Sequence, residues 1–264
     1  MSIAESFLSL HVPGRPLLMP NAWDAGSAKL LASLGFSALA TTSSGYATTL
    51  GRLDGQVTRD EVIGHSAALV DAVDVPVSAD LEAGFAASVA DVGETFRLAA
   101  GAGLAGGSIE DYAGIEEDTV YDIDAAAERV AAAAAAAGPD FVLTARAENH
   151  IRGRDDLDDT IARLRAYQEA GADVLFAPGV IAVEDVRRLV EAVDRPVSVL
   201  VLPGGPSVPE LAAAGAGRIS VGGAFAFAAL GAAKRAAEEL LGAGTTGYSD
   251  LAAEGSEALR AALS

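Results

Sequence analysis

The chain lacks several residue types that common protein functions need. Its 264 residues include no cysteine and only 3 histidines, and 18 Lys+Arg stand against 37 Asp+Glu. Without cysteine the protein can form no disulfide, no cysteine-ligated zinc site and no catalytic thiolate. The formal net charge of −19 repels the phosphates of nucleic acids, so we expect no nucleic-acid partner.

Long apolar segments are also missing. The first ten residues do not contain a basic stretch followed by an apolar one, which argues against a secretory signal. The longest apolar run, Ala131–Ala137, is far too short to span a bilayer. With 51% hydrophobic residues the chain can still bury a full core. We therefore expect a cytoplasmic globular protein with no membrane partner.

Short apolar runs alternate along the chain with amphipathic, alanine-rich segments such as 155–169 and 182–193. The runs lack polar alternation, as strands buried on both faces do; they are Leu17–Met19, Ala38–Thr42, Val75–Ala79, Ala105–Ile109, Phe141–Ala145, Val174–Ala177, Val197–Leu202 and Arg218–Val221. Eight such βα units predict an α/β fold, a (β/α)8 TIM barrel, with an open doubly wound sheet as the alternative. No G-x-G-x-x-G motif follows the first run, which argues against a dinucleotide-binding sheet.

A recurring junction supports this repeat. Glycines end predicted helices just before a strand, for example at Gly35 and Gly215, where a left-handed helix cap is needed. No linker interrupts the repeat, so we expect one barrel domain over residues 1–264. Residues 225–264 form a helical extension, broken at 242–247, that either caps the barrel or exchanges with another subunit.

Acidic residues follow three of the predicted strands. Asp54 lies in the loop after the second strand, Asp80 and Glu82 follow the third, and Glu110 follows the fourth. The carboxyl ends of barrel strands meet at one mouth, so these four carboxylates should converge there and attract a cation. Oxygen ligands suit Mg²⁺ or Mn²⁺. The competing interpretation is that an isolated acid such as Asp80 caps a helix.

Other polar residues near the strand ends suit an acidic ligand. Arg146, at the end of the fifth strand, can hold a carboxylate through a bidentate fork. Ser44 and Gly45 offer a hydroxyl and backbone N–H groups to an anion. Tyr46, which follows them, and Trp23, after the first strand, are further candidates for substrate binding, although Trp23 is equally compatible with a packed lid. Asp24 precedes a helical segment, and a role as its cap is favoured.

Five segments in this order resemble the isocitrate lyase / phosphoenolpyruvate mutase superfamily, over roughly residues 17 to 221. They are Thr42-Ser43-Ser44-Gly45, the loop with Asp54, Val77–Phe85, Ser108–Asp111 and Thr144–Arg146. The resemblance implies a barrel whose last helix is swapped to a neighbouring subunit, in a homodimer or homotetramer.

The same resemblance implies roles for individual residues. It assigns the carboxylate of a pyruvate-like substrate to Ser44, Gly45 and Arg146. It assigns the metal, Mg²⁺, to three acidic residues that hold it partly through water, namely Asp80, Glu82 and Glu110. Asp54 matches an aspartate of the strand-two loop of the family and is, with Arg146, the candidate catalytic residue.

The chain also departs from the family pattern. Glu82 replaces the second aspartate of the strand-three motif, and Ala177-Pro178 stands where methylisocitrate lyases have a glutamate. The loop over residues 111–119 contains neither the cysteine of the lyases nor a lysine. We therefore do not expect isocitrate or methylisocitrate lyase activity or phosphonopyruvate mutation.

The leading hypothesis is a Mg²⁺-dependent lyase or decarboxylase that acts on a small 2-oxo or 2-hydroxy carboxylic acid. Breaking a C–C bond beside a chelated 2-oxo acid gives an enolate that the metal stabilises, and this step needs no cysteine. The alternatives are mutase or hydrolase chemistry on a phosphonate or on phosphoenolpyruvate, a phosphate-binding barrel, and a barrel without catalytic activity.

Overall fold

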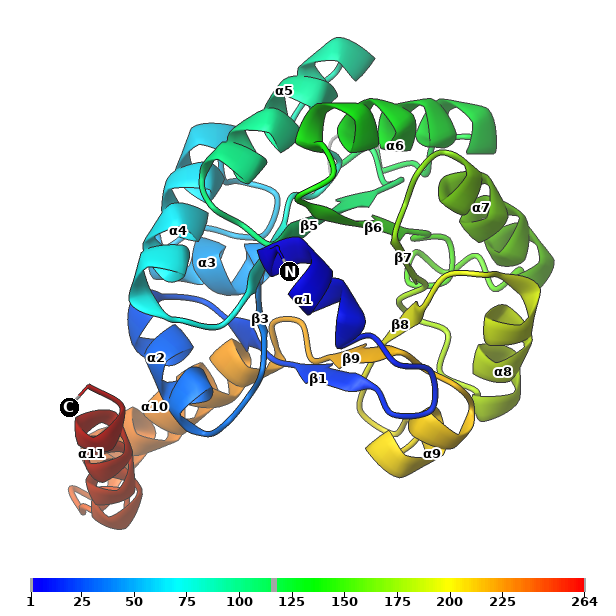
Figure 1. The fold of residues 1–264 in the computed structure, drawn as a ribbon. Coiled ribbons are helices and arrows are strands. Elements are labelled where there is room, and N and C mark those ends of the chain that lie inside the picture. The colour runs from blue at the N-terminus through cyan, green and yellow to red at the C-terminus, as the bar shows by residue number, and fades with distance from the viewer. Residues whose placement is uncertain (1, 115–117, 264) are drawn as a thin grey trace.

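The computed structural model describes residues 2–114 and 118–263, which form the expected (β/α)8 barrel (Figure 1). All strand pairs are parallel, in the order β1-β9-β8-β7-β6-β5-β4-β3-β2. The strands are β1 Leu17–Met19, β2 Asn21–Ala22, β3 Leu39–Thr41, β4 Val77–Asp80, β5 Gly106–Glu110, β6 Val142–Arg146, β7 Val174–Phe176, β8 Val197–Leu200 and β9 Arg218–Ser220. The eight predicted strands are confirmed to within two residues at each end.

The barrel closes at a strand that a proline divides into β1 and β2. Proline has no N–H to donate to a ladder, and Pro20 separates β1, which pairs with β9, from β2, which pairs with β3. The side chain of Asn21 joins the two sides: its amide donates to the Thr41 carbonyl at 2.7 Å and accepts from the Gly222 N–H at 2.9 Å. Asn21, which follows the first predicted strand, is therefore part of the closure.

Helices surround the barrel, and several of them begin at a residue whose side chain accepts a hydrogen bond from the backbone of the first turn. They are α1 Ile3–Ser9, α2 Ala25–Ser33, α3 Ser43–Thr49, α4 Arg59–Ala72, α5 Val89–Gly101, α6 Ile123–Ala137, α7 Leu157–Glu169, α8 Val183–Ala192, α9 Val208–Ala213, α10 Ala224–Gly242 and α11 Ser249–Leu263. Asp24 caps α2 by accepting from the Ser27 N–H at 2.6 Å, which confirms its predicted role. The glycine junctions also form as predicted, with φ of 93° at Gly35 and 95° at Gly215.

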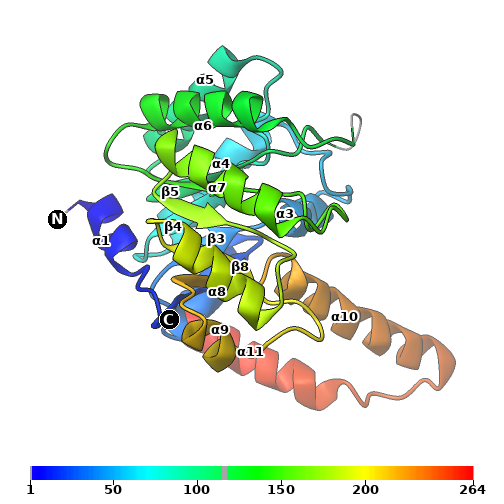
Figure 2. The same cartoon turned by 90° about the vertical axis from the view of Figure 1, so that its right-hand side faces the viewer.

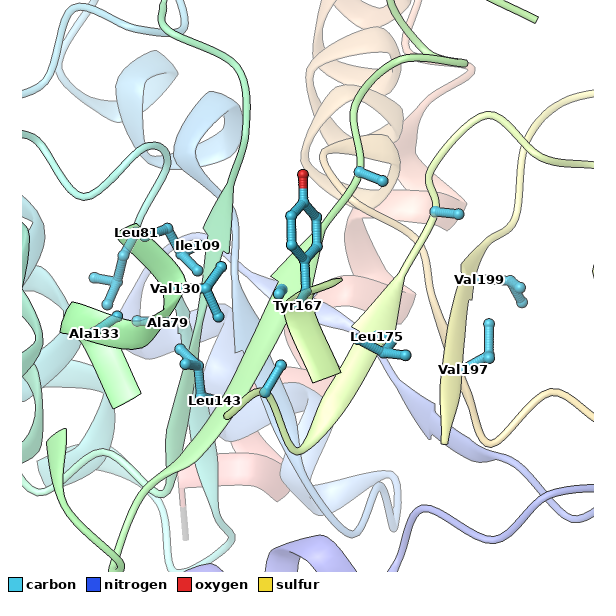
Figure 3. Packing of buried hydrophobic residues seen from close by; sticks show 14 of the residues in the cluster. Ala79, Leu81, Ile109, Val130, Ala133, Leu143, Tyr167, Leu175, Val197 and Val199 are labelled. Carbon is cyan, nitrogen blue, oxygen red and sulfur yellow. The ribbon is translucent and has the colours of Figure 1, made fainter. Parts of the chain in front are cut away.

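The apolar core lies between the strands and the helices, outside the barrel. Figure 3 shows strand residues such as Ile109, Leu143 and Leu175 packing towards Val130 of α6 and Tyr167 of α7. Side chains on the opposite face of each strand point into the barrel, since side-chain direction alternates along a strand. Barrels of this type are usually filled by large branched residues. Here much of the interior is polar, with buried hydroxyl side chains at Ser78, Thr144, Ser198 and Ser220.

The helix α1 closes the amino-terminal end of the barrel, opposite the end where α3 lies (Figure 2). Its Phe7 is fully buried and approaches β5, where Gly106 leaves the necessary room. A Cβ atom at Gly106 would lie 2.5 Å from the Val142 carbonyl oxygen and 3.1 Å from the Phe7 ring. The small residue in β5 therefore lets α1 and β6 pack closely.

The last two helices extend beyond the barrel and are separated at residues 243–248 (Figure 2). Within the chain α11 lies against α2. Apolar side chains of α10 remain exposed, among them Phe227, Leu230 and Leu241. A swap of the last helix between subunits stays a prediction. None of the helices described is both long enough and apolar enough to cross a membrane.

We predict that Gly106→Ala destabilises the protein by roughly 1–3 kcal/mol, because the added methyl group has no room between β6 and α1. Chemical denaturation followed by circular dichroism measures this change in the free energy of unfolding. The control is Gly64→Ala in α4, where a Cβ meets nothing within 4 Å. That substitution should be neutral or stabilise by up to about 1 kcal/mol. Equal effects of the two substitutions would contradict the packing of α1 against β5.

Candidate active site

Two adjoining hollows open at the carboxyl ends of the strands. An outer cleft of about 480 Å³ and an inner cavity of about 200 Å³ share Ser43, Asp54 and Arg146 in their walls. A groove of about 430 Å³ near α1 has Arg15 as its one charged lining residue and no carboxylate. Charged residues therefore converge at the mouth of the barrel, where the sequence predicts the site.

Arg146, the last residue of β6, lies at the centre of this mouth. Its guanidinium donates to Asp80 at 3.1 Å, contacts Glu110 at 3.1 Å and contacts Glu148 at 2.8 Å. Glu110 is its register partner on β5, and Asp80 ends β4, so the parallel ladder brings these side chains together. Of the metal-binding residues predicted, Asp80 and Glu110 are thus gathered around Arg146.

Glu148 is a site residue that the sequence reasoning did not assign. It follows Arg146 by two positions, and an extended chain places such residues on the same face. Its side chain is 1% exposed, and the backbone N–H of Glu148 donates to Asp111 at 2.8 Å. Asp111 is held in turn by Arg163 and the Tyr167 hydroxyl. The sequence signal that could have identified Glu148 is a charged pair, Arg146 and Glu148, two residues apart where a buried strand ends.

The cluster holds more carboxyl groups than basic groups. Three carboxylates surround the Arg146 guanidinium, and burial raises the pKa of Glu110 well above its usual range. Burial likewise raises the pKa of Glu148. Burial alone would lower the pKa of Arg146, but Glu148, Glu110 and Asp80 outweigh it and raise that pKa well above the ordinary value. The guanidinium is therefore permanently charged, and the carboxylates compete for it.

Glu82 lies in a tight turn directly after β4. Its backbone φ is 48°, a left-handed conformation that residues other than glycine rarely adopt. Arg129 holds this turn by donating to the Ala83 and Ala86 carbonyls at 2.8 and 2.6 Å. The Glu82 Oε1 atom is buried without a hydrogen-bond partner. Burial first, then Asp80 and Asp54, raise the pKa of Glu82 to about 8, although Arg146 acts in the opposite direction.

The donor chemistry of the mouth suits a divalent cation. Carboxylate oxygens are the ligands that Mg²⁺ and Mn²⁺ prefer, and the unpartnered Glu82 oxygen is the kind of acceptor that such an ion satisfies. Arg146 now occupies oxygens of Asp80 and Glu110. In the described part of the chain, no three acidic or histidine side chains form a ready-made ligand set. The metal assignment therefore stays a prediction, with ligands that would act partly through water.

The residues predicted to bind substrate are only partly at the cavity. Ser44 lines the inner cavity, and its hydroxyl lies 3.1 Å from that of Thr42. Gly45 does not line it, and its N–H donates to Thr42 at 3.3 Å. A Cβ at Gly45 would meet Thr42 at 2.5 Å and Trp23 at 3.1 Å, so the glycine is needed for packing.

Two further candidates lie outside both hollows. Tyr46 stacks on His65 with the ring centroids 3.8 Å apart and packs against the core. Trp23 lines neither hollow, and its Cβ would lie 3.1 Å from a Cβ added at Gly45. Tyr46 therefore packs against the core, and substrate contact by either aromatic residue stays a prediction. Asp54, by contrast, is exposed and lines both hollows, as a residue of the strand-two loop should.

The loop that departs from the family pattern borders the outer cleft. Tyr112, Ala113 and Gly114 line the cleft, whereas residues 115–117 lie outside the residues that the structure describes. Arg152 stacks over the Tyr112 ring at 3.5 Å and lies 3.7 Å from Glu148. The two arginines of the cleft are therefore both close to carboxylates.

Comparison with known proteins identifies the family. The family model for phosphoenolpyruvate phosphomutase matches residues 7–241. The chain belongs to the phosphoenolpyruvate phosphomutase family. It is 31% identical to 2,3-dimethylmalate lyase of Eubacterium barkeri, over 73% of this chain and 69% of that one. It is 30% identical to 2-methylisocitrate lyase of Escherichia coli (strain K12), over 72% and 70% of the respective chains.

Solved structures agree with this membership. A crystal structure of a protein from Burkholderia cenocepacia J2315 is 52% identical and superposes with a TM-score of 0.89, over 94% of this chain and 90% of that one. The resemblance to the isocitrate lyase / phosphoenolpyruvate mutase superfamily and the TIM barrel are thereby confirmed. The protein is an enzyme of this lyase and mutase type.

We predict that the metal-free protein loses stability as the pH rises from about 5 to 8. The folded-state pKa of Glu82 is above its unfolded value, so the folded state holds the proton more tightly. The resulting stability is complete below the unfolded pKa and is lost as the pH rises through about 8. Glu82→Gln should remove roughly 1–3 kcal/mol of this pH dependence.

Urea denaturation in the presence of a chelator, at several pH values, measures this effect. The matched control is Glu169→Gln at the exposed end of α7, which should keep the wild-type dependence. An unchanged pH dependence in Glu82→Gln would show that Glu82 is hydrated and ionised like a surface residue.

Proposed function

We propose that the protein is a Mg²⁺-dependent carbon–carbon lyase or decarboxylase that acts on a small 2-oxo or 2-hydroxy carboxylic acid. The observation that carries the proposal is the buried Arg146 surrounded by Asp80, Glu110 and Glu148 at the mouth of the barrel. Family membership supports the reaction class, because two relatives are lyases. Mn²⁺ is the alternative metal, since it prefers the same oxygen ligands.

The acidic residues of the mouth support the proposal of a metal ion. Asp80, Glu82 and Glu110 would hold the ion, and Glu82 would then exchange its proton for a cation. A divalent cation supplies Lewis acidity and stabilises negative charge that develops on substrate oxygens. With Asp80 and Glu110 engaged in this way, the N–H groups of Arg146 that face them become available to a substrate carboxylate.

Residues of the chain itself would bind and orient the substrate and transfer protons. Arg146 offers a planar fork to a carboxylate, and Glu148 holds the guanidinium by accepting from Nε at 3.0 Å. The Ser44 hydroxyl lies in the wall of the same cavity. Asp54 is exposed and lines both hollows, which supports a role in moving a proton to or from a water molecule. Protonation of the product from water needs no cysteine.

Phosphonate or phosphoenolpyruvate chemistry is the alternative that the family name suggests. Such substrates need basic groups around a phosphoryl group. The two arginines that line the outer cleft, Arg146 and Arg152, both lie close to the Glu148 carboxylate. The cleft as described therefore favours a small carboxylic acid over a phosphonate.

We also propose that the protein is a homodimer or homotetramer. The exposed apolar side chains of α10, Phe227 and Leu230 among them, support it, since monomeric proteins seldom expose such a surface.

We predict an oligomer at micromolar concentration in sedimentation velocity. Phe227→Asp should shift it towards the monomer, while Leu34→Asp, at an exposed leucine outside α10, should not. A monomeric wild-type protein would refute the proposal.

The test of the reaction is turnover of 2-oxo and 2-hydroxy acids with Mg²⁺. We predict that Arg146→Ala lowers kcat/KM by roughly 30- to several-thousand-fold, since breaking a buried charge pair costs about 2–5 kcal/mol. Arg146→Lys should rescue only in part, because an ammonium lacks the planar fork. The control Arg187→Ala removes an exposed arginine of α8 and should be neutral. Near-wild-type turnover by Arg146→Ala would move the active site elsewhere.

The metal is tested by binding. Asp80→Asn should abolish the rise in melting temperature that Mg²⁺ causes in the wild-type protein. If Asp80→Asn binds Mg²⁺ with unchanged affinity, the ligand assignment is wrong even where turnover is lost.

A further inference from the structure

A second buried arginine lies deeper in the barrel than Arg146. Arg218 begins β9 and is 3% exposed. Strand register places Arg146 beside Phe176, Phe176 beside Ser198, and Ser198 beside Arg218, in one row across β6, β7, β8 and β9. Residues in register share a face of the sheet, and Arg146, Phe176 and Arg218 all line the inner cavity.

Arg218 has no acidic partner within the described part of the chain. Its Nε donates to the Ser198 hydroxyl at 2.8 Å, and its Nη1 donates to the Thr144 hydroxyl at 3.1 Å and lies 3.5 Å from His11 Nε2. Hydroxyls and a ring nitrogen satisfy hydrogen bonds but carry no negative charge. The other arginine of the inner cavity, Arg146, has three carboxylates.

The groups that face Arg218 cannot supply the missing charge. Burial first, and then Arg218 itself, lower the pKa of His11 to about 3, so its ring is neutral. Burial, followed by repulsion from Arg146, lowers the pKa of Arg218 to about 9, and the guanidinium remains charged at neutral pH. A buried charge without a counter-ion is costly. An anion is therefore the group that this position lacks.

The inner cavity has room and hydrogen-bonding groups for a small anion. Its volume is about 200 Å³, and Ser78, Ser108 and Ser220 line it together with both arginines. The guanidinium carbons of Arg146 and Arg218 lie 5.4 and 6.0 Å from the centroid of the same Phe176 ring. One small molecule in this cavity can therefore reach both cations.

We propose that Arg218 forms an anion subsite inside the barrel that binds a carboxylate group. The carboxylate belongs either to a dicarboxylic acid whose other end lies near Arg146 and the mouth, or to a separate small acid. The first source rests on the proposed function, whereas the subsite itself does not. Arg218 thereby selects for acids short enough to fit between the two arginines.

Binding of sodium formate tests the subsite without any turnover. In a low-salt zwitterionic buffer, the melting temperature of the wild-type protein should rise with the logarithm of the formate concentration, because a ligand stabilises the state that binds it. Arg218→Met has a similar length without the charge and should lose this rise. The matched control Arg187→Met, at an exposed site, should keep it. Equal responses of wild type and Arg218→Met would overturn the proposal.

A second pair of variants keeps the test valid if Arg218→Met fails to fold. Ser198→Ala and Thr144→Val each remove one hydroxyl that orients the guanidinium and leave the charge in place. Both should weaken formate binding at least several-fold. Formate affinity unchanged in both would likewise overturn the proposal.

Calorimetry with Mg²⁺ distinguishes the two sources of the carboxylate. If a dicarboxylic substrate supplies it, Arg218→Met should weaken the binding of malonate or 2-oxoglutarate by at least tenfold and leave the affinity for pyruvate unchanged. Formate should then compete with the dicarboxylates and not with pyruvate. If a separate acid supplies it, formate should bind together with pyruvate and with the dicarboxylates. Both results support the subsite. Formate binding to a protein that turns over neither 2-oxo nor 2-hydroxy acids would refute the proposed reaction and leave the subsite standing.

Discussion

The burial of the Arg146 guanidinium is the constraint on which the mouth of the barrel depends. A cation removed from water needs partners, which are supplied by Asp80 at the end of β4, Glu110 at the end of β5 and Glu148 in the loop after β6. Three carboxylates share one arginine, and burial raises the pKa of Glu110 and of Glu148, whereas Arg146 acts in the opposite direction on both. Such a site is stable as an ion cluster and remains attractive to a cation. The same interaction thus explains both the order of the mouth and its expected affinity for a metal.

The order of the cluster is supported from outside the barrel. Asp111 receives the Glu148 N–H and is itself held by Arg163 and Tyr167, which come from α7. Arg129 of α6 holds the turn that carries Glu82. The helices α6 and α7 therefore each contribute polar contacts to the loop that follows the neighbouring strand, β4 and β5 respectively, while their apolar faces pack on the sheet. This division of roles lets the chain keep strained and charged residues at the mouth without loosening the core.

The sequence predicts the strands and most of the mouth, and it misses what depends on partners distant along the chain. Runs such as Phe141–Ala145 are recognisable because strands buried between helices and barrel interior need no polar alternation. The rule that strand ends share one mouth correctly gathers Asp80, Glu110 and Arg146. This rule does not identify Glu148 or Arg218, because a glutamate in a loop and an arginine at the start of a strand usually lie in water. Tyr46 and Trp23 follow strand ends too, but neither lines the inner cavity, and Tyr46 stacks on His65 instead.

Charge varies along the axis of the barrel, and this variation restricts what can bind. The mouth is acidic around Glu82 and Glu110, Arg146 lies at its inner edge, and Arg218 lies further in, sealed from the amino-terminal end by His11 and α1. A purely anionic molecule meets repulsion at the mouth, and a free cation meets repulsion inside. A small acid that enters together with a divalent cation satisfies both ends, because the cation neutralises the acidic mouth while carboxylate oxygens face the arginines. This variation of charge therefore supports the proposed binding of an acid together with a metal, and the inner cavity of about 200 Å³ fits an acid of few carbon atoms.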